Sequence, residues 1–162
     1  MRIETERLVV RMLQREDADA MQQTLQDFEQ SEYRLFDYKP PVDMDRIEVL
    51  MRYWVRSRKY YTLILKESEE KIGFISVGGD EIGFSLKTEF HNQGYGYEGT
   101  KAVIDYLSDK KKIKVFTAQA ALENIPSVKL LEKLGFVMKS TEEIQFRRSH
   151  PPVLCGNYEL KI

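Results

Sequence analysis

A glycine-rich segment, Gly94 to Gly99, holds the residue pattern best suited to chemistry in this sequence. It opens a stretch that we expect to be helical, and the first N–H groups of a helix lack backbone partners at the positive end of the helix dipole. Such a turn binds a diphosphate, and the small residues Gly94 and Gly96 let a ligand approach the backbone. The alternative is that these glycines only turn the chain.

The same segment fits G-x-G-x-x-G, the pattern of dinucleotide-binding folds, but its surroundings differ from theirs. In those folds the glycines follow a strand directly, and an acidic residue ends the next strand. Here seven residues separate Leu86 from Gly94, and the next expected strand contains Phe116 to Ala120 with no acid. Short strands rather than a βαβ unit precede the loop. These differences disfavour an NAD-type oxidoreductase.

Residue periodicity and turn residues predict which elements position this segment. We expect strands at Leu8–Met12, Tyr60–Lys66, Lys71–Val77, Glu81–Leu86, Ile113–Ala120, Val137–Arg147 and Leu154–Lys161. We expect helices at Glu16–Gln30, Asp43–Arg56, Tyr95–Ser108 and Pro126–Leu134. Asp43 or Asp45 is expected near the cap of the second helix, and Gly135 suits a left-handed helix end. The order is mixed, with too few βα units for a doubly wound sheet.

Composition limits the classes of protein to which the chain can belong. Its 162 residues suit one domain spanning 1–162, and 25 basic against 26 acidic residues argue against a nucleic-acid partner. A single cysteine, Cys155, excludes an intramolecular disulfide and a cysteine-rich zinc site, and we expect no metal. The first residues lack the apolar run of a secretion signal, and no stretch reaches the roughly 20 apolar residues of a membrane span. We therefore expect a cytoplasmic protein without a membrane partner.

Three segments resemble the GNAT superfamily of acetyl-CoA-dependent N-acetyltransferases, and in particular its RimJ/RimL-type branch, which acetylates ribosomal proteins. The first is Thr5 to Arg11, similar to the TERLxLR opening of that branch. The second combines Glu81 to Leu86 with Gly94 to Gly99, and the third is Asn124 to Phe136, close to NxxSxxLLEKLGF. The resemblance implies an α+β GNAT fold: a central mixed, mostly antiparallel twisted sheet of about six to seven strands flanked by about four helices.

The resemblance also implies how acetyl-CoA, the acyl donor, would bind. Backbone groups of three strand residues, Phe84, Ser85 and Leu86, would pair with the pantetheine arm as an added strand does. The pyrophosphate would be held by backbone amides of His91, Asn92, Gln93, Gly94, Tyr95 and Gly96. His91 stands where the family usually has Gln or Arg, so affinity is expected to be lower or more pH-dependent. Asn124 would reach the pantetheine or the substrate, or would only cap the following helix.

Two residues are candidates for the chemistry at the thioester. Glu81 lies where the family often places a general base, although it also fits a solvated carboxylate at a strand end. Ser127 lies where the family has its serine, close to the sulfur, and would stabilise the departing thiolate or only satisfy the first turn of its helix. Many relatives use a tyrosine four residues before the glycine of LGF, and this chain has Leu131 there. Cys155 has no His and Asp nearby in the sequence, so no cysteine intermediate is expected.

The expected activity is transfer of an acetyl group by direct attack of a primary amine on the thioester, the amine being a protein N-terminus or a small molecule. The alternative is a catalytically silent CoA-binding module that acts as a sensor or scaffold. Residues considered for the wall of the acceptor cleft are Tyr33, Phe36, Tyr38, Tyr53, Trp54 and His150, with Trp54 favoured as core. The acceptor itself is left open, and the chain is expected to be a monomer or a homodimer.

Overall fold

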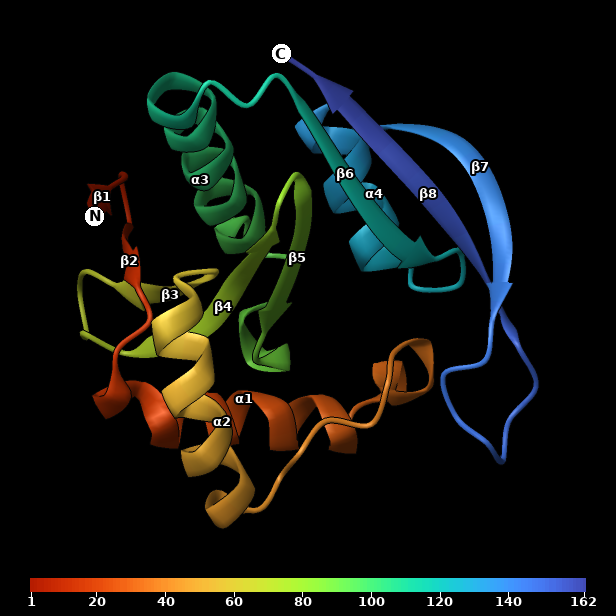
Figure 1. The fold of residues 1–162 in the computed structure, drawn as a ribbon, viewed down its shortest axis with the longest axis horizontal. Coiled ribbons are helices and arrows are strands. Elements are labelled where there is room, and N and C mark those ends of the chain that lie inside the picture. The colour runs from red at the N-terminus through yellow and green to blue at the C-terminus, as the bar shows by residue number, and fades with distance from the viewer.

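The computed structural model describes all residues, 1–162, and its centre is one eight-stranded sheet (Figure 1). The strands are β1 (Arg2–Glu4), β2 (Leu8–Met12), β3 (Tyr60–Leu65), β4 (Lys71–Gly78), β5 (Glu81–Leu86), β6 (Val115–Ala121), β7 (Val137–Ile144) and β8 (Val153–Lys161). Their order across the sheet is β1-β2-β3-β4-β5-β6-β8-β7, and every neighbouring pair is antiparallel except β5 with β6.

The parallel pair β5–β6 is joined at one end only. Glu81 pairs with Thr117, and the Thr117 N–H donates to Asp80 O at 2.9 Å, but no later register pair follows. The two strands then diverge toward Leu86 and Ala121 (Figure 1). A sheet that opens in this way leaves β5 backbone groups without a strand partner on that side, which makes room for an extended ligand.

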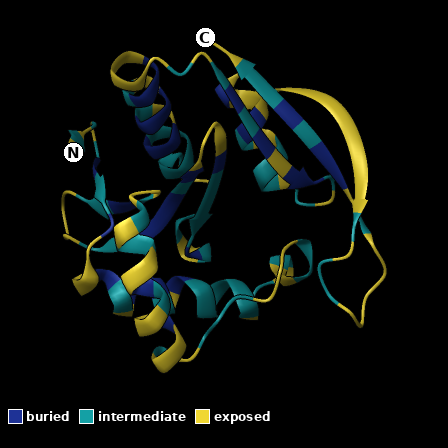
Figure 2. Cartoon of the chain, viewed as in Figure 1, coloured by how far each residue is buried: buried dark blue, intermediate teal, exposed yellow.

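Four α-helices cover the sheet: α1 (Ala18–Gln30), α2 (Met44–Ser57), α3 (Tyr95–Lys111) and α4 (Ile125–Leu134). Helices α3 and α4 contribute Val103, Ile104 and Leu131 to the larger apolar cluster, together with inward residues of β2, β3 and β4. Helices α1 and α2 form the smaller cluster with Leu13 and Phe74. Adjacent strand residues point to opposite faces, so the two helix pairs pack on opposite sides of the sheet. Figure 2 shows this buried interior and the exposed outer strand β7.

Buried charge ties α1 to the sheet just before the helix begins. The Asp17 side chain has no exposed surface, and its carboxylate accepts from both Arg11 guanidinium Nη atoms at 2.7 and 2.8 Å. It also accepts from Lys71 Nζ at 2.9 Å, Thr62 Oγ1 at 2.8 Å and the Gln14 N–H at 2.9 Å. Burial opposes the charge, but these hydrogen bonds outweigh it and hold the pKa of Asp17 well below its usual range.

Most predicted elements are confirmed, with small shifts at their ends. Asp43 caps α2 by accepting from the Arg46 N–H at 3.0 Å, so Asp43 rather than Asp45 is the cap. Gly135 ends α4 in the left-handed region at φ 92°, as expected. No helix is long and apolar enough to cross a membrane, and no group of three metal-binding side chains is present.

Three element predictions need correction. The prediction of six to seven strands misses β1, whose three residues are too few to show an alternating pattern. The strand predicted over Val137 to Arg147 stops at Ile144, because the Gln145 side chain bonds the carbonyl groups of Arg147 and His150 and folds the chain into a loop. The helix predicted to end at Ser108 continues to Lys111.

Candidate active site

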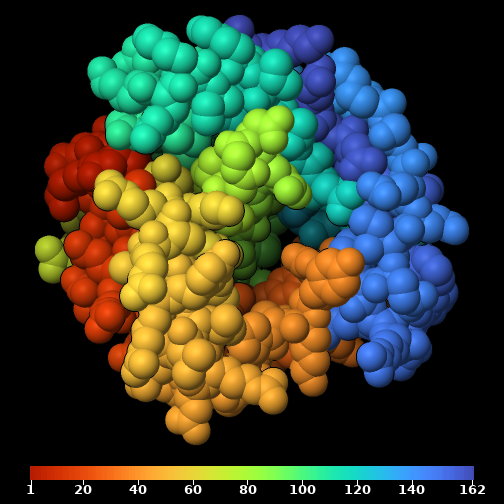
Figure 3. All heavy atoms as spheres, in the orientation of Figure 1, coloured from red at the N-terminus to blue at the C-terminus, as the bar shows by residue number.

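A cleft of about 620 Å³ opens where β5 and β6 separate. One side is formed by β5, the loop before α3, the end of β6 and the first turns of α4. The other side is formed by α1 and by the segment that follows it, which contains a short 3-10 helix, Glu32–Phe36. Figure 3 shows the surface hollowed between that orange segment, the green of β5 and the blue C-terminal strands.

The N-terminus of α3 presents free backbone donors at this cleft. Gly94 precedes the helix in the left-handed region at φ 85°, and the first helical hydrogen bond runs from the Glu98 N–H to Gly94 O at 3.0 Å. The N–H groups of Tyr95, Gly96 and Tyr97 therefore have no partner within the helix, and no side chain caps them. Free donors at the positive end of a 17-residue helix suit a diphosphate.

Side chains from the first strand region fix this turn from behind. The Glu98 carboxylate accepts from the Arg7 N–H and Arg7 Nε, each at 2.7 Å, and from the Thr5 hydroxyl. Arg7 also donates to Gln93 O at 2.9 Å, and its guanidinium lies 4.3 Å from the centre of the Tyr95 ring. Burial opposes the charge of Glu98, but these hydrogen bonds hold its pKa below the usual range. The Thr5–Arg7 segment and the glycine-rich segment are thus two halves of one structure.

The two glycines of the turn have different reasons for lacking a side chain. Gly94 needs its positive φ, and a Cβ there would lie 3.1 Å from Arg7 Nη2. A Cβ on Gly96 would lie 3.1 Å from Leu130 Cδ2, so Gly96 also lets α3 approach α4 closely. Gly96 therefore has a packing role in addition to the predicted one of letting a ligand approach the backbone.

The structure brings most of the predicted cofactor-binding residues to the cleft wall. Those lining it are Phe84, Ser85, Leu86, His91, Asn92, Gly94, Gly96, Asn124 and Ser127. Gln93 and Tyr95 are not among the lining residues. The Gln93 side chain turns back to Glu89 O at 2.6 Å, and the Tyr95 ring packs beside Arg7 and Phe90. These two residues offer the cleft no side chain.

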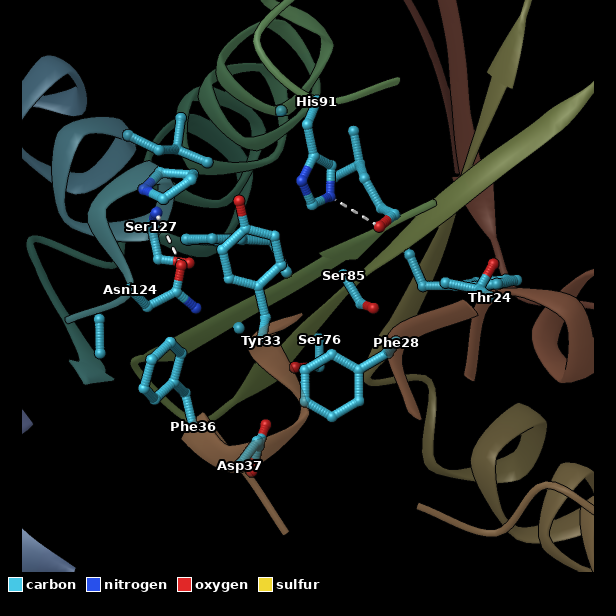
Figure 4. Close-up of a pocket in the computed structure, with 18 of the residues that line it drawn as sticks. Thr24, Phe28, Tyr33, Phe36, Asp37, Ser76, Ser85, His91, Asn124 and Ser127 are labelled. Carbon is cyan, nitrogen blue, oxygen red and sulfur yellow. Dashed lines mark hydrogen bonds between the residues drawn. The ribbon is translucent and has the colours of Figure 1, made fainter. Parts of the chain in front are cut away.

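His91 differs from its expected role. Its N–H already donates to Thr88 O at 3.0 Å, so it contributes no free amide for a pyrophosphate. Its ring Nε2 lies 2.9 Å from Leu86 O, and the ring lies 5.7 Å from that of Tyr33 (Figure 4). His91 thus connects the end of β5 to the opposite wall of the cleft.

The start of α4 carries Asn124 and Ser127. Asn124 Oδ1 accepts from the Ser127 N–H at 3.4 Å, so Asn124 caps α4 (Figure 4). Because Asn124 also lines the cleft, its contact with the pantetheine or the substrate stays a prediction. The Ser127 Oγ makes no hydrogen bond to another protein atom, although the residue is only partly exposed and lines the cleft. A hydroxyl with a free proton therefore lies at the N-terminal end of α4, where the helix dipole favours a developing negative charge.

A model of the acetyltransferase (GNAT) domain family matches residues 7–137. This range includes the glycine turn before α3, the strands β5 and β6, and α4. The chain belongs to the GNAT acetyltransferase family. It is 30% identical over 144 residues to the uncharacterized N-acetyltransferase p20 of Bacillus licheniformis, covering 82% of this chain and 80% of that protein. Membership makes the protein an N-acetyltransferase, an acyl-transferring enzyme.

Solved structures share the whole fold of this GNAT acetyltransferase. The ribosomal-protein-S5-alanine acetyltransferase of Vibrio fischeri superposes with a TM-score of 0.87 over 99% of this chain and 96% of that one, at 17% identity. RimL, a ribosomal L7/L12 α-N-protein acetyltransferase solved in complex with coenzyme A, superposes with a TM-score of 0.84 over 100% and 98%, at 13% identity. The expected α+β GNAT fold is confirmed.

Glu81 is not brought to the cleft of this GNAT acetyltransferase. It is exposed at the closed end of the β5–β6 pair and lines a separate, smaller pocket with Lys139 and Glu159. Ser127 lies in the main cleft, so the two predicted catalytic residues do not share a site. The sequence position suggested a base at the start of β5, but the strands part only after Glu81.

Three charged residues of the cleft escaped the sequence analysis. Lys129 and Lys133 line it from α4, and Lys133 Nζ lies 4.6 Å from the centre of the Tyr97 ring. Their spacing of four on a helix that starts at the expected cofactor site was a usable signal. Asp37 lines the opposite end, and nothing in its sequence context marks it.

The residues considered for the acceptor wall divide into two groups. Tyr33, Phe36 and Tyr38 line the cleft, and Trp54 does so too while packing against the smaller core. Tyr53 is 64% exposed on the outer face of α2, and His150 lies in the exposed loop before β8. Neither of these two residues lines the cleft.

Proposed function

We propose that this enzyme binds acetyl-CoA in the cleft between β5, the start of α3 and the start of α4, and transfers the acetyl group directly to a primary amine. The observation that carries the proposal is the set of free N–H groups at the start of α3, of which those of Gly96 and Tyr97 belong to residues that line the same cleft as β5. RimL, a structural neighbour, was solved with coenzyme A, and MccE, another, with acetyl-CoA and AMP. We also propose that 1–162 acts as one domain, because one sheet runs through it.

In this proposal, acetyl-CoA supplies the activated acetyl group, and the residues of the chain hold and orient it. The α3 amides bind the diphosphate, and Lys129 and Lys133 add positive charge on that side of the cleft. The backbone of Phe84 to Leu86 pairs with the pantetheine arm, which places the thioester beside the first turn of α4. Nothing in this binding mode requires the side chain of Glu81.

The acetyl transfer needs a neutral amine and a stabilised leaving group. The neutral amine nitrogen attacks the thioester carbonyl carbon, the C–N bond forms, and the C–S bond breaks with its electron pair on sulfur. The proton that the nitrogen loses goes to solvent water, and the CoA thiolate takes up a proton from solvent after it leaves. Ser127 Oγ is a free hydroxyl at the N-terminal end of α4, and we assign it the hydrogen bond to the departing sulfur. Leu131, which replaces the family tyrosine, is fully buried in the core and cannot serve.

Calorimetry and thiol detection together test the proposed function. We expect purified protein to bind acetyl-CoA and not NADH, and to release free CoA thiol only when a primary amine is added. Failure to bind acetyl-CoA would contradict the assignment of the cleft. Binding without amine-dependent thiol release across a panel of primary amines would instead support the catalytically silent CoA-binding alternative.

Replacing Ser127 with Ala tests its role at the sulfur. Because Asn124 bonds the Ser127 backbone N–H and not Oγ, the substitution leaves the α4 cap in place. We expect kcat to fall about tenfold or more while the Kd of acetyl-CoA stays unchanged, since the hydroxyl acts mainly on the developing thiolate. Ser68→Ala, in the exposed turn between β3 and β4, is the control. An unchanged kcat in Ser127→Ala, with the chemical step rate-limiting, would remove Ser127 from the mechanism.

A further inference from the structure

The cleft continues past the proposed acetyl-CoA site to a second end, which we call the acceptor end. Its walls come from the C-terminal half of α1 and the segment after it, and they include Phe28, Tyr33, Phe36, Asp37 and Tyr38. Figure 4 shows Asp37 between the rings of Phe28 and Phe36 in this view, and the Tyr33 ring between the start of α4 and Ser85. The acceptor end is thus a mainly aromatic chamber that holds one acidic group.

The charges lining the cleft are separated between its two ends. Lys129, Lys133 and His91 are its basic residues. The two lysines belong to α4, on the side that suits the phosphates of acetyl-CoA, and His91 lies between that side and Tyr33 of the acceptor end. Asp37 is the one carboxylate among all the residues that line the cleft. A ligand that fills the acceptor end therefore meets a negative charge close to aromatic faces, and both favour a cation.

The Asp37 carboxylate is held by one hydrogen bond and keeps one oxygen without a hydrogen-bond partner. One oxygen, Oδ1, accepts from the Tyr38 N–H at 2.7 Å, and Oδ2 has no partner. Arg147 is a neighbouring cation, but its guanidinium makes no hydrogen bond to the Asp37 carboxylate. It pairs with Glu29 at 2.9 Å and donates to the backbone oxygens of Asp37 and Arg34. Arg147 therefore fixes the backbone of the acceptor end and leaves a carboxylate oxygen available.

The surroundings of Asp37 raise the energy of its charge when no ligand is bound. The residue as a whole is exposed, while neighbouring groups replace part of the water around its carboxyl group. This loss of water raises the pKa of Asp37, against the opposing effects of the Tyr38 amide and the Arg147 charge. A bound ammonium group would replace the missing water.

We propose that Asp37 selects the acceptor of this enzyme by accepting a hydrogen bond from the amino group of a primary amine that carries an apolar group and no adjacent carboxylate. The amine arrives as an ammonium ion and releases one proton to solvent water before its nitrogen attacks the thioester. The inference rests on the proposed acetyl transfer and adds the chemical class of the acceptor. An amine of this kind places its apolar group against Phe28 and Phe36. A free α-amino acid brings a second carboxylate toward Asp37 and is repelled.

Three acceptors of closely related shape test this selection: phenethylamine, L-phenylalaninamide and L-phenylalanine. All three carry a primary amine on the same aromatic skeleton, and only phenylalanine has a free carboxylate. We expect the first two to be acetylated with a kcat/KM about tenfold or more above that of phenylalanine. Phenethylamine represents a free small amine and phenylalaninamide a peptide N-terminus, so their ratio distinguishes these two sources of the acceptor.

The Asp37→Asn variant keeps the side-chain shape and the backbone bond from Arg147 while removing the charge. We expect its kcat/KM for both amines to fall about tenfold to a hundredfold, mainly through KM, and the discrimination against phenylalanine to disappear. The Kd of acetyl-CoA should not change. Asp45→Asn, on the exposed side of α2 and outside the cleft, is the matched control and should behave as the unchanged protein.

The outcomes separate this inference from the proposed function. The selection by Asp37 would be overturned if the kcat/KM of Asp37→Asn for the amines stayed within about twofold of the unchanged protein. It would also be overturned if phenylalanine and phenylalaninamide were used equally. Either result would leave acetyl transfer standing. If none of the acceptors releases thiol, phenethylamine is titrated calorimetrically into the protein saturated with CoA. If phenethylamine binds to the unchanged protein and not to Asp37→Asn, the amine site stands and acetyl transfer is rejected. If phenethylamine does not bind to the unchanged protein, the inference is overturned.

Discussion

Gly94→Val is expected to weaken acetyl-CoA binding by about a hundredfold or more. Gly94 has a φ of 85°, a region in which a β-branched residue is strongly strained. The new Cβ would also lie 3.1 Å from Arg7 Nη2, and Arg7 cannot move away without losing its hydrogen bonds to Glu98 and Gln93. The turn must therefore change shape, and the free amides of α3 lose their common direction. Calorimetric titration with acetyl-CoA measures the loss.

Gly79→Val is the matched control for backbone strain. Gly79 also has a positive φ, 76°, but it lies in the β4–β5 turn, and a Cβ there meets no atom within 4 Å. We expect Gly79→Val to lower the unfolding temperature while acetyl-CoA affinity stays close to that of the unchanged protein. Equal losses of affinity in both variants would show that the effect comes from general destabilisation and would contradict the role of the Gly94 turn.

A milder variant, Glu98→Gln, tests the contacts between Arg7 and Glu98 separately from the glycine turn that they support. It keeps the size of the side chain but removes the charge that pairs with Arg7, so the turn is held less firmly while its glycines are unchanged. We expect a weaker loss of acetyl-CoA affinity than in Gly94→Val, about tenfold, in the same titration. An affinity equal to that of the unchanged protein would show that Glu98 and Arg7 serve stability alone.

The cofactor half of the cleft was largely predictable from sequence because its elements are local. Gly94, Gly96 and the helix that follows lie in one continuous segment, and a glycine turn before a helix has the same consequence wherever it occurs. The caps at Asp43 and Gly135 were predictable for the same reason: each depends on a residue type and its immediate neighbours.

The acceptor half was predictable only in part, through the aromatic residues Tyr33, Phe36 and Tyr38, because its arrangement depends on contacts between distant segments. Asp37 lies in an irregular stretch without periodicity, and its position is fixed by Arg147, 110 residues away in the chain. The position of Glu81 outside the main cleft was not predictable for a related reason. Its sequence position places it on β5, but only the pairing of β5 with β6 shows that Glu81 lies at the closed end. The ion pair between Arg7 and Glu98, 91 residues apart, was also not predictable, although each of the two residues belongs to a segment with a recognisable pattern.

Asp17→Asn is expected to have the largest effect on stability, lowering the free energy of unfolding at pH 7 by about 3 kcal/mol. The substitution leaves Arg11 and Lys71 beside a neutral amide in a site where Asp17 has no exposed surface. Urea unfolding measures the change. Asp109→Asn is the control: the pKa of Asp109 is also lowered by a neighbouring lysine, Lys110, but both side chains are exposed, so the unfolding midpoint should not move.

The pH dependence gives the Asp17 prediction a second readout. Because the fold lowers the pKa of Asp17, its charge stabilises the protein fully above the unfolded value, about 4, and progressively less as the pH falls below it. The difference in stability between the unchanged protein and Asp17→Asn should therefore shrink on acidification from pH 7 toward pH 3. A difference that stays constant over this range would mean that packing, and not charge, accounts for the loss.

The same network links stability to the acceptor end of the cleft. Asp17 joins Arg11 of β2, Thr62 of β3 and Lys71 of β4 at the start of α1, and α1 forms one wall of the acceptor end. Molecules of Asp17→Asn that remain folded should therefore show a raised KM for the amine and an unchanged Kd for acetyl-CoA, because the proposed acetyl-CoA site is built from elements on the other side of the cleft. If both constants change together, α1 is not positioned independently of the cofactor half, and the two ends of the cleft respond as one unit.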